Sequence, residues 1–312
     1  MDIRDIQNLA ATLLRPPVHG RIIERAARGA EFRQWAVSLT DPAPGTSLQL
    51  DDEDFLQGIG TSRPVAHYSR FPVSQAAEHL AAVDVLISDW FNGAVPPPPA
   101  SRSWPSSVMV LCRSAMEAAA RTIWLIGDPS RETRRLRCAA EAVKELGEMH
   151  KWTRQNRDVD AAEGRNVDGF AASEEKLKQA IAAAESAAKG TSAPGFTAMT
   201  LAGAAWIDAN PPVHESELLK GRPFEAMTKA WYSIGSSYTH GYNWTLGILR
   251  NQDEQFGLVA DLLMSAVLMT ESAVALFESQ MLAPAQQWHN DHLPARLGPS
   301  IADWAPRYSD IS

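Results

Sequence analysis

Three charged side chains recur at four-residue steps inside an apolar segment, and this is the arrangement in the sequence best suited to chemistry. Arg113, Glu117 and Arg121 lie in the segment 106–127, whose other residues are mostly aliphatic or alanine. In a helix, four-residue steps place side chains on one narrow stripe, and a helix that is apolar all round is usually buried. Buried charges must be paired, because desolvating an unpaired charge costs several kcal/mol.

The stripe keeps one surplus positive charge even if Glu117 pairs with both arginines. Something anionic should complete it: Asp261 or Glu271, which interrupt a long apolar segment further along the chain, or the carboxylate or phosphate of a ligand. A surface salt-bridge ladder, or a buried structural network without a ligand, is the alternative. The sequence therefore indicates Arg113 and Arg121 as candidate ligand-binding residues and Glu117 as a candidate catalytic carboxylate.

A second segment, residues 229–244, gathers small polar residues and a histidine on one side of a predicted helix. Ser233, Ser236, Ser237 and His240 are spaced by three, four and seven residues. Serine is a poor mid-helix residue because it competes for backbone hydrogen bonds. One reason for the serines is close helix packing; the other is a polar pocket floored by hydroxyls, with His240 as acid, base or donor. The pair lacks the nucleophile elbow and orienting acid of a catalytic triad.

The sequence indicates neither a metal nor a nucleotide cofactor. No Glu-x-x-His pair occurs, although a di-iron site in a helical bundle would need one on each of two helices. The glycines show neither the dinucleotide-binding nor the phosphate-loop spacing. Cys112 and Cys138 lie in predicted helices, and we expect both to be buried free thiols in a reducing compartment.

Charge and hydropathy exclude several kinds of partner. The net charge of −8 argues against a protein that grips duplex DNA, although a local basic patch is possible where arginines cluster between Arg131 and Arg137. The acidic N-terminal stretch has no apolar core of a secretory signal. The apolar segment from Leu258 to Phe277 carries two acids, so we expect a buried core helix rather than a membrane span. We therefore expect a cytoplasmic protein without membrane contacts.

Helical periodicity, with no alternating strand pattern, predicts an all-α multi-helix bundle. Expected helices cover residues 3–14, 21–39, 74–90, 106–127, 129–152, 173–189, 214–220, 223–240 and 258–281. The run Pro96–Pro99 is expected to be a stiff spacer, 157–171 a polar loop and 191–212 an irregular stretch. We expect N-terminal helices (1–95) that pack on a helical core (96–282), and an irregular Pro/Trp/His-containing tail (283–312), in one compact unit.

The segments LCRSAMEAAARTIWL, RETRRLRC and WYSIGSSYTHG together resemble a poorly characterised group of bacterial all-helical proteins in or near the HEPN-like superfamily, beside the AbiV-type abortive-infection proteins. The matching positions are Arg113 with Glu117, and Tyr232 with Ser236 and His240, within residues 75–280. The resemblance implies a HEPN-like helical bundle that is often dimeric.

Active members of the HEPN-like superfamily are metal-independent ribonucleases of toxin–antitoxin or phage-defence systems. Their signature is an arginine followed, after four to six residues, by a histidine. No histidine of this chain fits this spacing. His19 and His67 follow Arg15 and Arg63, but with only three residues between them. The resemblance therefore implies binding of RNA or a protein partner, in a defence or regulatory role, by a homo-oligomer that lacks the ribonuclease signature.

The expected site is a polar pocket between the two marked helices. Its members are Arg113, Arg121, Tyr232, Ser236 and Ser237 as ligand-binding residues, with His240 and Glu117 as candidate catalytic groups. A small-molecule enzyme or sensor is the alternative, in which the arginines hold an anionic ligand and the histidine moves a proton. A purely structural or oligomerisation module is the third interpretation.

Overall fold

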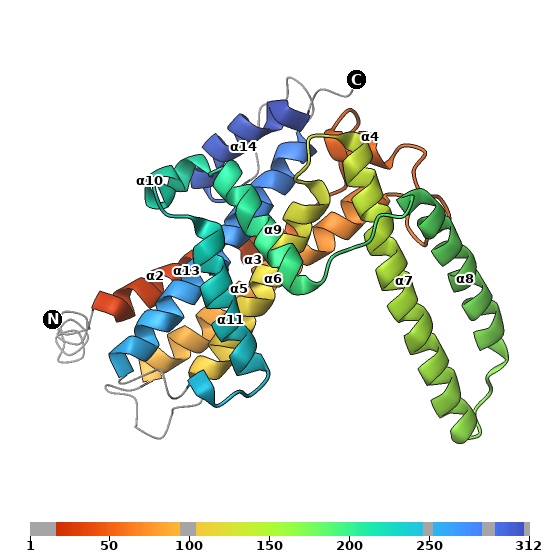
Figure 1. Ribbon diagram of the computed structural model, residues 1–312, viewed down its shortest axis with the longest axis horizontal. Coiled ribbons are helices and arrows are strands. Elements are labelled where there is room, and N and C mark those ends of the chain that lie inside the picture. The colour runs from red at the N-terminus through yellow and green to blue at the C-terminus, as the bar shows by residue number, and fades with distance from the viewer. Residues whose placement is uncertain (1–16, 94–103, 246–251, 283–290, 309–312) are drawn as a thin grey trace.

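The computed structural model describes residues 17–93, 104–245, 252–282 and 291–308, and in this part of the chain it contains helices and no strand (Figure 1). The expectation of an all-α multi-helix bundle is confirmed. The expected helix over 3–14 and the Pro96–Pro99 spacer lie outside the described residues. The α-helices are α2 (Pro17–Ala30), α3 (Phe32–Ser38), α4 (Ser47–Asp52), α5 (Pro64–Gly93), α6 (Trp104–Ile126), α7 (Arg131–Ala162), α8 (Asp168–Ala188), α9 (Phe196–Ala209), α10 (Ser216–Leu219), α11 (Phe224–Thr239), α13 (Gln252–Met281) and α14 (Gly298–Trp304), and the short 3-10 turns are η1 (Val213–Glu215), η2 (Ala295–Leu297) and η3 (Ala305–Tyr308).

Helix α6 is the central rod of the bundle. It packs against α5, α13, α9 and α11, and its apolar residues are buried on several sides, as the sequence predicts. Cys112 on α6 and Cys138 on α7 are buried free thiols, also as expected. Burial of so much aliphatic surface at about 25 cal/mol per Å² is the main stabilising contribution to such a body.

Helix α13 is the second core helix. Among the described residues it alone is long and apolar enough to cross a membrane, yet 89% of its most apolar stretch is buried by neighbouring helices. Helices α2, α5, α6 and α11 cover it. The expectation of a buried core helix is therefore confirmed, and its burial is consistent with a soluble protein.

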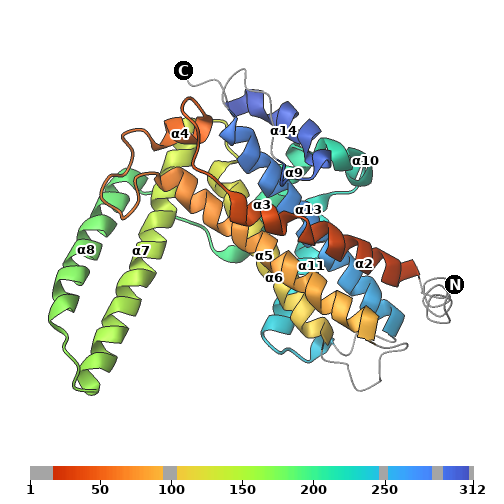
Figure 2. The same cartoon turned by 180° about the vertical axis from the view of Figure 1, so that it is seen from behind.

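Helices α7 and α8 form an antiparallel pair, here called the arm, that extends away from the bundle in both views (Figures 1 and 2). Leu177, Ala180 and Ala184 of α8 are buried against α7. Arg157 of α7 also binds Glu174 of α8 at 2.7 Å. These contacts stabilise the C-terminal part of α7, which ends at Ala162. The polar loop expected at 157–171 is therefore shorter and spans residues 163–167.

A buried ion pair fixes the base of the arm to the bundle. The Arg134 guanidinium, 2% exposed, donates to both oxygens of the fully buried Asp51 carboxylate, at 2.5 and 2.8 Å. It also donates to the backbone carbonyls of Asp128 and Pro129. Asp51 lies in the last turn of α4, and its neighbour Asp52, the last residue of that helix, accepts the Val65 N–H at the start of α5. Two adjacent aspartates thereby join α4 to two long helices.

The neighbouring arginines of α7 cap helix ends instead of forming a basic surface. Arg131 and Arg135 donate to carbonyls at the C-terminal end of α4, and Arg137 donates to the carbonyl of Trp124 near the end of α6. The last carbonyls of a helix have no partner within the helix and attract cations. The possible basic patch between Arg131 and Arg137 is therefore committed to contacts within the protein.

Two segments are more ordered than the sequence indicates. Residues 196–209, within the expected irregular stretch, form α9, which approaches α6 so closely that a Cβ on Gly203 would lie 2.9 Å from the Cβ of Ala120. Residues 291–308, within the expected irregular tail, contain α14, whose Trp304 is fully buried. In both cases glycine or proline suggests a break, but burial of apolar side chains stabilises a helix.

Replacing Asp51 with Asn should lower the free energy of unfolding by about 3–5 kcal/mol, because it leaves the Arg134 charge buried without a counter-ion. Chemical denaturation measures the change. The matched control is Asp54→Asn, at an exposed position two residues after α4 ends. Equal effects of the two substitutions would show that the ion pair does not hold the arm to the bundle.

Candidate functional site

The structure brings together three of the residues that the sequence indicates. Arg113 binds Glu117 at 2.7 Å one turn along α6. Tyr232 of α11 donates its hydroxyl to Glu117 Oε1 at 2.5 Å, and Arg113 donates to the Tyr232 oxygen at 3.4 Å. The guanidinium carbon also lies 5.2 Å from the centre of the tyrosine ring. An arginine, a carboxylate and a phenol thus form one closed group between α6 and α11.

The charges of this group balance each other. The Arg113 and Glu117 side chains are 15% and 16% exposed, and one positive charge faces one negative charge. Burial, together with the hydrogen bond to Glu117, raises the pKa of Tyr232. The phenol therefore stays protonated near neutral pH and remains a donor to the carboxylate.

Arg121, one turn further along α6, belongs to a different group. It binds Glu141 at 2.9 Å and also binds Glu145, both on α7. The surplus positive charge of the stripe is therefore balanced by α7. The expectation that Asp261 or Glu271 completes the stripe is wrong, because these acids bind other arginines.

The serines of α11 favour the packing explanation over the pocket explanation. The Ser237 hydroxyl donates to the Ser233 carbonyl and the Ser233 hydroxyl to the Lys229 carbonyl, one turn back in the same helix. Gly235 lies where a Cβ would come within 3.1 Å of the Arg113 Cβ. Small residues therefore let α11 approach α6, and the Ser237 hydroxyl is engaged with its own helix. The Ser236 side chain is half-buried, and its carbonyl accepts the backbone N–H that follows the helix.

His240 lies at the C-terminal cap of α11, and its side chain is exposed. Its ring centre is 5.8 Å from that of Tyr242. Eight residues of helix separate it from Tyr232, about 12 Å along the axis. Within the described residues, no hydrogen bond or ion pair joins His240 to Arg113 or Glu117. The structure therefore places the histidine apart from the Arg113–Glu117–Tyr232 group.

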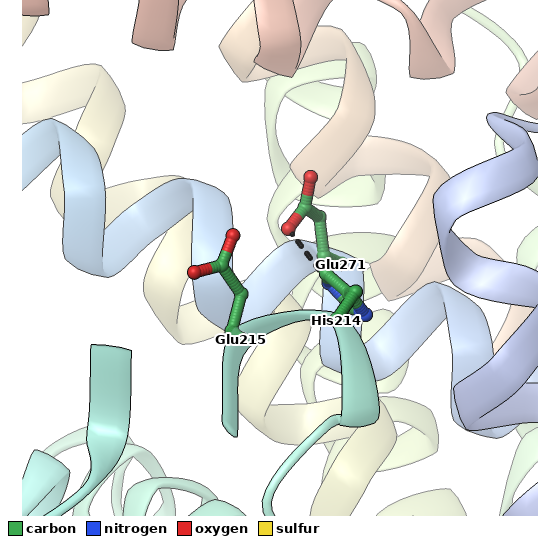
Figure 3. Close-up of side chains that lie close together, drawn as sticks. All are labelled: His214, Glu215 and Glu271. Carbon is green, nitrogen blue, oxygen red and sulfur yellow. Dashed lines mark hydrogen bonds and ion pairs between the residues drawn. The ribbon is translucent and has the colours of Figure 1, made fainter. Parts of the chain in front are cut away.

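A second polar cluster surrounds Glu271, on the core helix α13 (Figure 3). This carboxylate is fully buried, and Arg28 of α2 binds both of its oxygens, at 2.6 and 2.5 Å. Arg296 of η2 donates to Oε1 at 2.7 Å. His214 of η1 contacts Oε2 at 3.1 Å, and Glu215 binds the same Arg28 nitrogen that binds Oε2. Four segments far apart in the sequence thus meet at one carboxylate.

The partners determine the protonation state of this carboxyl group. Burial alone would raise the pKa of Glu271, but hydrogen bonds from His214 and Arg28, with the charges of Arg28 and Arg296, lower it to about 2. The group is therefore ionised at every physiological pH. A depressed folded-state pKa contributes stability above about pH 4.5, and this stability is lost as the pH falls towards 2.

The cluster resembles a metal site in composition. The ligand atoms of His214, Glu215 and Glu271 lie within 4.8 Å of one another, and imidazole with two carboxylates is a common zinc donor set. However, the Arg28 guanidinium already binds both carboxylates, so a divalent cation would have to displace it. The donor set therefore fits an ion-pair network better than a metal centre.

The same cluster contains a serine–histidine–glutamate string. Ser300 Oγ lies 3.0 Å from His214 Nδ1 and accepts the Val213 N–H at 2.9 Å. The hydroxyl therefore donates to Nδ1, which leaves Nε2–H to donate to Glu271. Ser300 is fully buried, so it is not presented to a substrate. The string positions η1 against α13 and α14.

The arm carries an exposed apolar stripe, here called the α7 stripe. Three of its large side chains are exposed: Met149 (53%), Trp152 (62%) and Val159 (51%). Together with Asn156, they recur along the helix at steps of three, four and three residues. This spacing is that of the contact positions of a helix that pairs with another helix. Sequence reasoning missed the stripe because it predicts that α7 ends near residue 152.

The Glu271 cluster was recognisable in part from sequence. A charge in the middle of an apolar helix must find partners, and this is the signal that singles out Glu271. Nothing in the local sequence indicates that Arg28 and Arg296 provide them.

No family model matches the chain, and no curated protein or solved structure matches it either.

Substituting Gln for Glu271 should lower the free energy of unfolding at pH 7 by about 3–5 kcal/mol, since two guanidinium groups lose their shared counter-ion. The variant should also lose the part of the acid destabilisation that the wild type shows between about pH 4.5 and 2. Denaturant titrations across this pH range measure both effects. Glu217→Gln, on a side chain that is 88% exposed, is the control. A variant with wild-type acid sensitivity contradicts the assignment.

Removing the hydroxyl of Tyr232 with phenylalanine should lower the free energy of unfolding by about 1–2 kcal/mol, because Glu117 loses a buried donor. Thermal denaturation measures the loss. The corresponding change at the exposed Tyr242 should stay within about 0.5 kcal/mol. Indistinguishable melting temperatures for the two variants would mean that the α6–α11 group is not a structural contact.

Proposed function

We propose that this protein is a cytoplasmic interaction protein, and that the α7 stripe of its arm pairs with the α7 stripe of a second copy. The observation that carries the proposal is the exposure of Met149, Trp152 and Val159 at contact-position spacing on a helix that extends from the bundle. The resulting dimer would serve the defence or regulatory role that the HEPN-like resemblance implies.

The spacing supports a helical partner. Large apolar side chains at steps of three and four residues insert between those of a facing helix. Helices α7 and α8 already form half of a four-helix bundle, and a second arm would supply the other half. Exposed tryptophan and methionine are also enriched in protein interfaces relative to the rest of the surface.

Asn156 supports a second copy over an unrelated helix. Asparagine at a contact position is poorly satisfied against an apolar residue, but it can bond with the same asparagine across a two-fold axis. In a parallel pairing of two α7 helices, Asn156 faces Asn156 of the second copy. A stripe of this size buries little area, so we expect a reversible dimer with a Kd on the order of micromolar.

The charges favour a protein partner over RNA. The arginine cluster of α7 is committed to α4 and α6, and Arg113 and Arg121 are paired with acids. An RNA-binding groove needs free cations near stacking aromatics, and the chain carries a net charge of −8. Because Arg113 and Arg121 are paired with acids, an anionic ligand is no longer needed to balance their charge in the pocket expected between α6 and α11.

Sedimentation velocity between about 1 and 100 μM tests the proposal, because a micromolar dimer dissociates in this range. The wild type should change from monomer to dimer, and Trp152→Glu should stay monomeric. Trp244→Glu, at an exposed tryptophan outside the arm, should dimerise as the wild type does. Asn156→Asp should also prevent dimerisation in a parallel pairing, where the new charge faces itself.

A wild type that stays monomeric throughout this range overturns the proposal. So does equal weakening by Trp152→Glu and Trp244→Glu. Gel-shift measurements with single-stranded RNA form the second arm of the experiment. RNA binding that Trp152→Glu abolishes, without dimerisation of the wild type, would replace the protein partner with RNA.

A further inference from the structure

A groove of about 350 Å³ lies between α2, α10 and α13, on the outer side of the Glu271 cluster. Its walls differ in character. One wall presents the arginines of α2, with Glu24 and Glu215, and the other is apolar and consists of Leu218, Met264, Val267 and Leu268. A volume of this size is at the lower end of small-molecule sites, which join an apolar wall to a few placed polar groups.

The arginines of the groove lie on one face of α2. Arg21, Arg25 and Arg28 are separated by four and three residues, so their guanidinium groups point to the same side of the helix. Arg28 is fixed by Glu271 and Glu215. Burial, opposed by Asp261 and reinforced by the two neighbouring arginines, lowers the pKa of Arg25. An anion placed among these groups would relieve their mutual repulsion.

Two of the guanidinium groups keep donors for a ligand. Arg25 donates to the Ala260 carbonyl through one nitrogen and lies 3.8 Å from Asp261, a loose contact. Arg21 is exposed and forms no ion pair within the described part of the chain. A guanidinium matches a planar carboxylate with two parallel hydrogen bonds. Because Asp261 and Glu24 also lie nearby, a single negative charge fits this site better than a doubly charged phosphate.

We infer that the groove binds an amphipathic monocarboxylate, whose head group is held by Arg21 and Arg25 and whose aliphatic tail lies on the apolar wall formed by α10 and α13. The inference is independent of the dimer proposed above, because the groove shares no residue with the arm. It requires both walls at once: the arginines select the charge, and the aliphatic side chains select the tail.

Isothermal titration of the full chain with octanoate tests the inference. Octanoate should bind. Acetate should bind more weakly because it lacks an aliphatic tail, and octylamine should not bind because it lacks a negative charge. The double substitution Arg21→Gln and Arg25→Gln should raise the Kd for octanoate at least about tenfold, as expected for lost charge-assisted hydrogen bonds. Arg33→Gln, at an exposed arginine of α3 outside the groove, should leave it unchanged.

Leu218→Asn tests the apolar wall separately, because it removes apolar surface without adding a charge, at a side chain that is 37% exposed and can change without disturbing the core. It should weaken octanoate binding while acetate binding stays the same. Circular dichroism of each variant verifies the fold. Equal binding of octanoate and octylamine, or no binding of octanoate, overturns the inference. Binding to phosphatidylglycerol vesicles that the Arg21→Gln and Arg25→Gln double substitution abolishes, with no binding of free octanoate, would assign the groove to a lipid surface instead.

Discussion

A fully buried carboxylate on the most apolar helix is the constraint on which the rest of this structure depends. Glu271 is ionised within the core, and an isolated charge there would cost more than the whole stability of a typical domain. The requirement for counter-charges brings Arg28 of α2, His214 of η1 and Arg296 of η2 to one point. Without them, the segments that cover α13 would have apolar contacts, but no specific contact would fix their positions along this helix.

The same rule governs the other internal charges. Asp51 binds Arg134 at the base of the arm, and Arg121 binds Glu141 between α6 and α7. Each pair joins two helices, and each uses up a charge that a ligand would otherwise need. The two surfaces proposed for partners, the α7 stripe and the groove beside α2, are ones that internal pairing leaves exposed. The function proposed for the arm follows from what the interior leaves exposed.

The sequence predicts the core helices well, because α6 and α13 have long apolar runs that only a buried helix satisfies. It also identifies Arg113, Glu117 and Tyr232, which the structure brings together. The sequence does not predict which charged side chains pair across helices, since the partners of Arg121 depend on how α7 packs against α6. Likewise α9 is not predicted, because Pro194, Gly195 and Pro211-Pro212 on either side of it suggest an irregular stretch. Gly203 within it permits close packing on α6.

The most direct test of this account is a carbon-13 NMR titration of the Glu271 carboxyl group in the folded protein. We expect a pKa of about 2, because two guanidinium groups and the imidazole stabilise the ionised form. A pKa at or above the ordinary 4.5 would contradict the account, since burial would then dominate and the carboxylate could not organise the helices around it.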